Sequence, residues 1–145
     1  MLVRSDGMLV RVGLPKPERR ELMAGAVERA DGFGDLARRL RLYFQGERVE
    51  FSDVPVKFEG LGAFEERALR ETMRVPYGQL TTYSALAGAV GSPGAARAVG
   101  NAMSRNPMPI IVPCHRVVRS DGSIGGYSAG TLVKRRLLAL EGIAI

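Results

Sequence analysis

The segment Ile110–Val118, which reads Ile-Ile-Val-Pro-Cys-His-Arg-Val-Val, constrains this chain more than any other stretch. It carries the only cysteine, Cys114, and the only histidine, His115, among 145 residues. One cysteine excludes an internal disulfide, and one cysteine with one histidine cannot supply the ligands of a typical zinc site. The chain must therefore fold by burying its apolar residues, which make up 46% of the sequence. We expect no metal and no cofactor.

Two interpretations of Cys114 follow from its neighbours. A thiol reacts as the thiolate, and an adjacent imidazole together with the charge of Arg116 favours that form. A single cysteine in an intracellular protein can equally be a small buried hydrophobe. Adjacent side chains of an extended segment point to opposite sides, so a contact between Cys114 and His115 needs a turn or a bridging water. The segment leaves both interpretations open.

Positive charge is concentrated in the second part of the chain. The net charge is +6; residues 1–60 carry 11 Lys and Arg against 10 Asp and Glu, whereas residues 61–145 carry 10 against 5. This distribution favours a polyanionic partner, with a solvated basic face as the alternative. The sequence contains neither a membrane-spanning apolar run nor the apolar run of a secretory signal, so we expect a cytoplasmic protein without membrane contact.

The first residues predict a hairpin and a helix. Two short apolar segments, Leu2–Arg4 and Met8–Val12, flank Ser5-Asp6-Gly7, which is a plausible turn between antiparallel strands. Pro17 fits the first position of a helix that ends near Gly32. No recognisable chemistry is found here, and a small scaffold is the favoured interpretation.

A second predicted helix begins at Asp35, whose carboxylate can cap it. Its apolar residues recur at helical spacing and are Leu36, Leu40, Tyr43 and Phe44. Val49–Phe58 is interrupted by a proline and predicts an edge strand or an extended linker. A glycine-flanked boundary then divides the chain into domains 1–60 and 61–145.

The second domain is predicted to be mostly helical. A helix over Ala63–Val75 is followed by a short helix that Thr81 or Thr82 can cap, a glycine turn, and a helix from about Ala95 to Ser104. The last two resemble a helix-turn-helix, whose second helix commonly enters a DNA groove. Because that helix consists mainly of small residues, it can approach a sugar-phosphate backbone closely but can read few bases. A helix packed inside the protein is the alternative.

The C-terminal helix contains a carboxylate in an unfavourable place. Thr131 can cap this helix, and its leucines are predicted to be mostly core, namely Leu132, Leu137, Leu138 and Leu140. Glu141 ends the helix at Gly142, where the helix macrodipole opposes a negative charge. Such a violation often marks function, and the useful partner of Glu141 is His115. Upstream, Ile110–Val112 predicts a buried strand or extended run.

These residues together resemble the O6-alkylguanine-DNA alkyltransferase family. The resemblance rests on Pro113–Val117, on the preceding Asn106-Pro107, on Gly126-Tyr127-Ser128, and on the terminal stretch Leu137–Gly142. It is close over residues 75–142, weaker from Leu42 to Phe64, and limited to coarse pattern before that. It implies an α+β fold, in which an antiparallel sheet and a helix form the N-terminal domain and a winged-helix-like domain with a helix-turn-helix follows.

The resemblance also implies a stoichiometric DNA repair reaction, with the catalytic residues Cys114, His115, Glu141, Tyr83, Asn106 and Lys134. Cys114 takes the alkyl group of O6-alkylguanine in duplex DNA and keeps it; O4-alkylthymine is a second candidate lesion. His115 deprotonates Cys114 through a water, and Glu141 orients the imidazole. Tyr83 donates to guanine N3, and Asn106 ties the recognition helix to the active-site loop. A soft thiolate suits displacement at an alkyl carbon, and the thioether product is stable.

Further roles concern the guanine pocket and the DNA surface. Val117 (through its backbone), Tyr127 and Ser128 are expected to line the pocket, and Lys134 to assist at the guanine. Arg97 would fill the gap left in the base stack by a flipped base. The expected DNA surface is the minor groove, read with little sequence preference by a monomer. Its residues are Arg97, Tyr83, Ala96, Thr82 and Arg105.

Three other functions compete with this one. A non-catalytic relative of the same fold would bind the lesion and recruit other repair proteins, but such proteins replace the cysteine. A transcription regulator would leave Cys114 inert and prefer one DNA sequence, which the small-residue helix disfavours. A cysteine hydrolase would have to turn over its substrates with Cys114, His115 and Glu141 alone.

Overall fold

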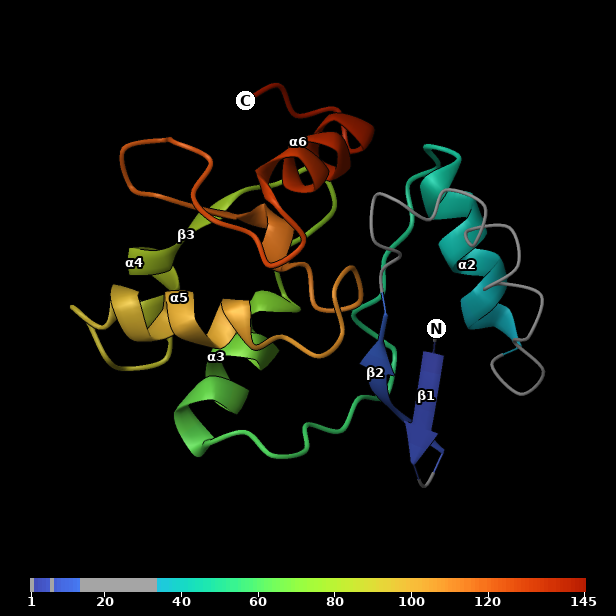
Figure 1. Cartoon of the computed structure of the whole chain (residues 1–145), viewed down its shortest axis with the longest axis horizontal. Helices are drawn as coiled ribbons and strands as arrows, with labels where there is room; N and C mark the ends of the chain where they lie inside the picture. Colours follow the sequence, from blue (N-terminus) through green and yellow to red (C-terminus); the bar gives the residue numbers. More distant parts are fainter. Residues whose placement is uncertain (1, 6, 14–33) are drawn as a thin grey trace.

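The computed structural model describes residues 2–5, 7–13 and 34–145 (Figure 1). Strands β1 (Leu2–Ser5) and β2 (Met8–Val12) pair antiparallel, as predicted. The centre of the predicted turn, Asp6, and the predicted helix from Pro17 to Gly32 lie outside the described residues. In the described part of the chain, no helix is long and apolar enough to cross a membrane.

Helix α2 (Asp35–Phe44) packs its apolar face against the core through Leu36, Leu40 and Tyr43. One detail of the prediction is wrong. Gly34 occupies the N-cap position, and Asp35 is the first helical residue, where its carboxylate pairs with arginines one turn later. Phe44 is 39% exposed, because its position places the side chain at the edge of the buried stripe.

Residues 49–62 form the extended connection between the two halves (Figure 1). Of the two predicted forms, the linker is the one found, because Val56 makes a single bridge to Leu9 rather than a strand. Around that bridge the Leu9 N–H donates to the Pro55 carbonyl and the Lys57 N–H donates to the Leu9 carbonyl, each at 2.9 Å. The linker thus lies along β2 before it reaches the helical half.

The second half begins with three helices, α3 (Ala63–Thr72), α4 (Tyr83–Ala89) and α5 (Ala96–Ser104). The Thr82 hydroxyl accepts a hydrogen bond from the Ala85 N–H at 3.0 Å, so the predicted cap of α4 is confirmed. Helix α5 packs against both α3 and α4 (Figure 1) and buries Val99, Ala102 and Met103. The predicted helix-turn-helix is therefore present.

Helix α6 (Thr131–Leu140) follows a long loop. Gly130, with φ of 94°, holds the N-cap position that the sequence suggested for Thr131. Leu137 and Leu138 are buried, but Leu132 is 61% exposed, because it lies in the first turn on the side away from the core. The chain is an α+β protein, as predicted.

One continuous core joins the two halves. Its members include Leu9 and Tyr43 from the first half and Leu69, Val99 and Val112 from the second. The Val12 N–H also donates to the Pro107 carbonyl at 2.8 Å, which joins β2 directly to the segment before Cys114. The first half is thus packed against the functional segment.

Candidate functional site

The segment before the cysteine is buried but sharply bent. Ile110, Ile111 and Val112 are at most 1% exposed, yet Ile110 has φ of +75° and the Val112 N–H donates back to the Met108 carbonyl at 2.8 Å. The predicted strand or extended run is wrong here. Prolines before and within this stretch remove ladder donors, so turn hydrogen bonds satisfy the backbone instead.

Cys114, His115 and Arg116 form one turn of 3-10 helix, and all three are buried. Because this segment is a turn and not an extended strand, the side chains of Cys114 and His115 need not point to opposite sides. Strand β4 (Val117–Val118) then pairs in parallel with β3 (Thr81–Thr82), so the residues after the turn are joined to the start of α4.

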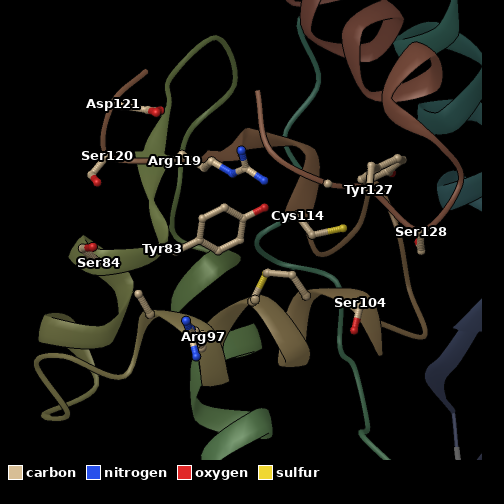
Figure 2. A pocket seen from close by; sticks show the side chains of 14 residues that line it. Tyr83, Ser84, Arg97, Ser104, Cys114, Arg119, Ser120, Asp121, Tyr127 and Ser128 are labelled. Atoms are coloured by element: carbon tan, nitrogen blue, oxygen red, sulfur yellow. The ribbon is translucent and has the colours of Figure 1, made fainter. Parts of the chain in front are cut away.

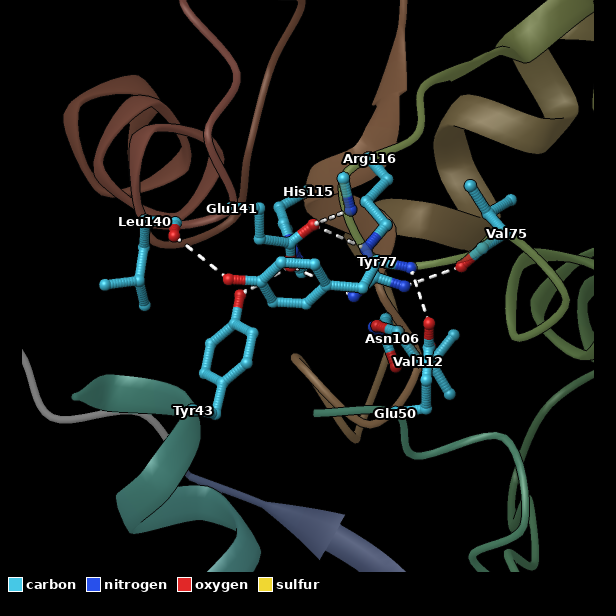
Figure 3. Close-up of polar contacts among 11 residues, drawn as sticks. Tyr43, Glu50, Val75, Tyr77, Asn106, Val112, His115, Arg116, Leu140 and Glu141 are labelled. Atoms are coloured by element: carbon cyan, nitrogen blue, oxygen red, sulfur yellow. Dashed lines mark hydrogen bonds and ion pairs between the residues drawn. The ribbon is translucent and has the colours of Figure 1, made fainter. Parts of the chain in front are cut away.

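Glu141, at the C-cap of α6, binds two residues of this turn, His115 and Arg116, through its carboxylate (Figure 3). Its Oε1 lies 2.7 Å from His115 Nε2, as the sequence suggested, and Arg116 donates to Oε2 at 2.9 Å and to Oε1 at 3.0 Å. The Gly78 N–H adds a hydrogen bond to Oε2 at 3.1 Å. Burial opposes the charge of Glu141, but bonds from His115 and Arg116 outweigh it and lower the pKa to about 2. Glu141 is therefore an anion.

The negative charge of Glu141 determines which ring nitrogen of His115 carries the hydrogen. Burial lowers the pKa of His115, although Glu141 acts in the opposite direction, so the imidazole is neutral. Because an ionised carboxylate can only accept, Nε2 carries the hydrogen and Nδ1 carries the lone pair. Nδ1 is buried and has no hydrogen-bond partner among the residues that the structure describes. His115 therefore presents a free base position.

Asn106 links the end of α5 to the cysteine. Its amide nitrogen donates to the Val112 carbonyl at 2.9 Å and lies 3.1 Å from Cys114 Sγ, while its oxygen accepts from the Met108 N–H. Burial raises the pKa of the Cys114 thiol, and the hydrogen bond from Asn106 and the charge of Lys134 partly offset this. The resting thiol is thus protonated and needs a base.

Cys114 opens into a cavity of about 580 Å³ beside α5 (Figure 2). In this view it lies between Tyr83 and Tyr127, while Arg97 and Arg119 lie on opposite sides of Tyr83. The predicted residues that line the cavity are Tyr83, Ala96, Arg97, Cys114, Tyr127 and Ser128. A flat ligand that enters it would lie between two aromatic rings and above a thiol.

Four of the residues predicted for the guanine pocket or the DNA surface do not line the cavity, and Lys134 is one of them. Its ammonium is buried beneath the loop before α6, where it donates to the carbonyls of Val117 and Ile124 at 2.5 Å and to that of Gly126 at 3.2 Å. Burial lowers the pKa of Lys134 to about 8. These contacts hold the loop, and the ammonium also lies 5.8 Å from the centroid of the Tyr83 ring, which lines the cavity. Val117, fully buried in β4, likewise does not line the cavity, because its carbonyl accepts from Lys134.

Arg105 does not face the cavity either. Its guanidinium, on a side chain that is 54% exposed, lies 2.5 Å from the Glu65 carboxylate on α3, and its expected place on the DNA surface stays untested. Thr82 is the cap of α4 and also lies outside the cavity lining. Both residues belong to the helix-turn-helix, but their side chains have structural partners.

Two residues that the sequence did not single out belong to the site. Arg119 lines the cavity, and only its place shortly after Cys114 offered a signal. Tyr43 reaches Glu141 from α2, 98 residues away in the chain, so no local pattern could have revealed it. A helix-turn-helix with a thiol, imidazole and carboxylate beneath a cavity defines a class: nucleic-acid-binding proteins with a reactive cysteine.

Comparison with known proteins places the chain within that class. Residues 63–143 match the family model of the 6-O-methylguanine DNA methyltransferase DNA-binding domain, and residues 2–58 match that of its ribonuclease-like domain. The methylated-DNA–protein-cysteine methyltransferase of Metallosphaera sedula is 44% identical over 115 residues, which cover 79% of this chain and 71% of that protein. The chain therefore belongs to the 6-O-methylguanine DNA methyltransferase family.

The solved structures that are similar to this chain include two complexes with DNA. Mycobacterium tuberculosis OGT in complex with DNA has a TM-score of 0.80 and 36% identity, covering 97% of this chain and 85% of that one. S. pombe Atl1 in complex with damaged DNA containing O6-carboxymethylguanine has a TM-score of 0.53 and 36% identity, covering 60% of this chain and 82% of that one. The protein binds DNA and repairs O6-alkylguanine by direct reversal, with transfer of the alkyl group to a protein cysteine.

Proposed function

We propose that Cys114 is the alkyl acceptor, with His115 as its base and Glu141 as the group that orients His115. The observation that carries this assignment is the contact of Glu141 with the Nε2 of a neutral imidazole, whose buried Nδ1 has no partner among the described residues; the buried thiol of Cys114 belongs to the preceding residue. A protonated thiol needs such a base, and a bridging water can connect the two.

The reaction then balances as a single displacement. The Cys114 proton passes to His115 Nδ1, the thiolate attacks the alkyl carbon, and a C–S bond forms as the C–O6 bond breaks. The electron pair stays with the guanine, which takes up a proton; the Tyr83 hydroxyl, in the cavity wall, is the proposed donor at N3. Because the chain contains no second cysteine, it cannot reverse the thioether by itself, and each molecule reacts once.

The DNA-binding side is proposed to be α5, entering the minor groove and flipping the damaged base into the cavity. Its small residues allow close approach, and Arg97, exposed at the cavity, is placed to replace the flipped base in the stack. Arg119 adds a second cation at the cavity, where a phosphate of the flipped nucleotide would lie. Few long side chains remain for reading bases, which supports weak sequence preference.

We also propose that one chain suffices. One chain supplies the cavity lining and the contacts around Glu141, so the proposed reaction requires no residue of a second copy, and we propose that the protein acts as a monomer. All residues of the cavity lining come from the proposed second domain, 61–145. This division assigns DNA binding and alkyl acceptance to residues 61–145 and a supporting role to residues 1–60.

Mass spectrometry after reaction with a duplex that carries one O6-methylguanine tests this function. We expect each protein to gain one CH2, on the peptide that contains Cys114, with saturation at one equivalent. Cys114→Ser should bind the same duplex without gaining mass. If the wild-type chain binds the lesion but its mass stays unchanged, it is a damage sensor; if Cys114→Ser is still alkylated, the acceptor is wrongly assigned.

A further inference from the structure

Tyr43 brings the N-terminal half into direct contact with the proposed base and its carboxylate. The side chain is fully buried on α2, and its hydroxyl donates to Glu141 Oε1 at 2.7 Å (Figure 3). The same hydroxyl lies 3.3 Å from His115 Nε2. Tyr43 and His115 thus share one oxygen atom of Glu141.

The charge states of Tyr43, His115 and Glu141 determine which groups donate a hydrogen to this shared oxygen. Burial and the neighbouring Glu141 anion raise the pKa of Tyr43 well above its ordinary range, so its hydroxyl keeps its proton. Nε2–H of His115 and O–H of Tyr43 are both donors, and they point at the same acceptor rather than at each other. Their close approach is therefore a consequence of the shared acceptor.

The Tyr43 hydroxyl is held in place by its surroundings. Its ring makes edge-to-face contacts with Phe51 and Tyr77, with ring centroids 5.9 and 6.1 Å apart. Tyr77 approaches the same region but donates its hydroxyl to the Leu140 carbonyl at 3.0 Å, and not to Glu141. Both tyrosines are thus buried, and their hydroxyls bind different acceptors.

We propose that Tyr43 is a positioning residue for alkyl transfer, which holds Glu141 Oε1 against His115 Nε2 and moderates the basicity of that carboxylate. This inference rests on the proposed roles of Cys114, His115 and Glu141. It assigns the N-terminal half a part in the reaction in addition to its part in the fold.

The effect of losing the hydroxyl has a definite sign. Without this donor the Glu141 carboxylate is less stabilised and more basic, so it favours the imidazolium form of His115 more strongly. The other ionisable groups near His115, namely Arg116, Lys134 and Tyr77, remain in place. The pKa of His115 should therefore rise in Tyr43→Phe, and less of the free base should be present at a given pH.

The test compares Tyr43→Phe with Tyr77→Phe. We expect Tyr43→Phe to slow transfer about tenfold, the size of one hydrogen bond to a charged group, equally with an O6-methylguanine duplex and with free O6-benzylguanine. Its affinity for the duplex should be unchanged, and the acid limb of its rate profile should move to higher pH. Tyr77→Phe, which loses a bond to a backbone carbonyl, should keep the wild-type pH profile.

NMR titration of the imidazole provides a second readout that does not need alkyl transfer. Because His115 is the only histidine in the sequence, its signal is unambiguous, and folded and unfolded forms can be told apart. An unchanged rate profile and an unchanged His115 titration in Tyr43→Phe would overturn the proposal, as would equal changes in Tyr77→Phe. A wild-type chain that transfers nothing would refute the proposed function, while the titration would still decide the link between Tyr43 and His115.

Discussion

Single residues in this protein have roles that depend on what their side chains already bind. Arg97 and Arg105 lie at opposite ends of the same helix-turn-helix element, and their types alone do not distinguish them. Arg97 is exposed at the cavity, whereas Arg105 is paired with Glu65 on α3. A guanidinium with a carboxylate partner at 2.5 Å contributes little to attraction of phosphate, so we expect only Arg97 to matter for repair.

Arg97→Ala should slow repair of an O6-methylguanine duplex by at least about tenfold, because the unstacked site loses the side chain that fills it. Reaction with free O6-benzylguanine should change little, since no base has to be flipped. Arg105→Ala is the matched control and should leave both rates close to wild type. Single-turnover rates with the two substrates measure this; equal losses on both substrates in Arg97→Ala would remove its role in base flipping.

At the scale of elements, the loop between β4 and α6 depends on one buried cation. Lys134 is fully buried and binds three carbonyl groups, two of which belong to Ile124 and Gly126 in this loop. The same loop carries Tyr127 and Ser128 into the cavity lining. Helix α6, through Lys134, thus holds the loop that forms one wall of the cavity.

Lys134→Met should loosen this wall, because it leaves buried carbonyls without a donor at a cost of about 1–3 kcal/mol each in the absence of water. We expect faster hydrogen exchange at residues 119–130 and a higher concentration of free O6-benzylguanine for half-maximal rate. Arg136→Met, an exposed change on the same helix, is the control. Unchanged exchange in Lys134→Met would show that other contacts hold the loop.

At the scale of the whole molecule, Glu141 joins parts of the chain that are far apart in sequence. Its carboxylate receives donors from α2, from the loop before β3 and from the turn at Cys114. A buried anion with this many partners contributes to stability only while it is ionised. The protein should therefore be sensitive to acid at this one residue.

The sign of this effect follows from the pKa of Glu141, which is about 2 in the folded protein against an ordinary 4.5. Its contribution is fully present above about pH 4.5 and is lost as the pH falls towards 2, a total of about 3 kcal/mol. Urea unfolding at several pH values should show this loss.

Glu141→Gln should be less stable by about 3–5 kcal/mol at pH 7, since Arg116 stays buried without an anion, and should lack the acid-dependent fall. A Glu141→Gln protein as stable as wild type at pH 7 would contradict this account.

Local sequence was sufficient for the features whose causes are local. The strands of the hairpin, the cap at Thr82 and the small-residue helix follow from spacing, capping chemistry and residue size, which act over a few positions. The unfavourable place of Glu141 at a helix end was also visible locally, and it indicated the contact with His115 that the structure contains.

Tertiary structure decided the rest, because contacts between distant segments have no local signature. The bend at Ile110, the use of Lys134 under the loop and the pairing of Arg105 with Glu65 all depend on which elements become neighbours. Tyr43 is the clearest example: its spacing predicted a core residue, and its packing and burial confirm that. Only the fold brings its hydroxyl to Glu141, since that hydrogen bond exists after two halves of the chain have packed together.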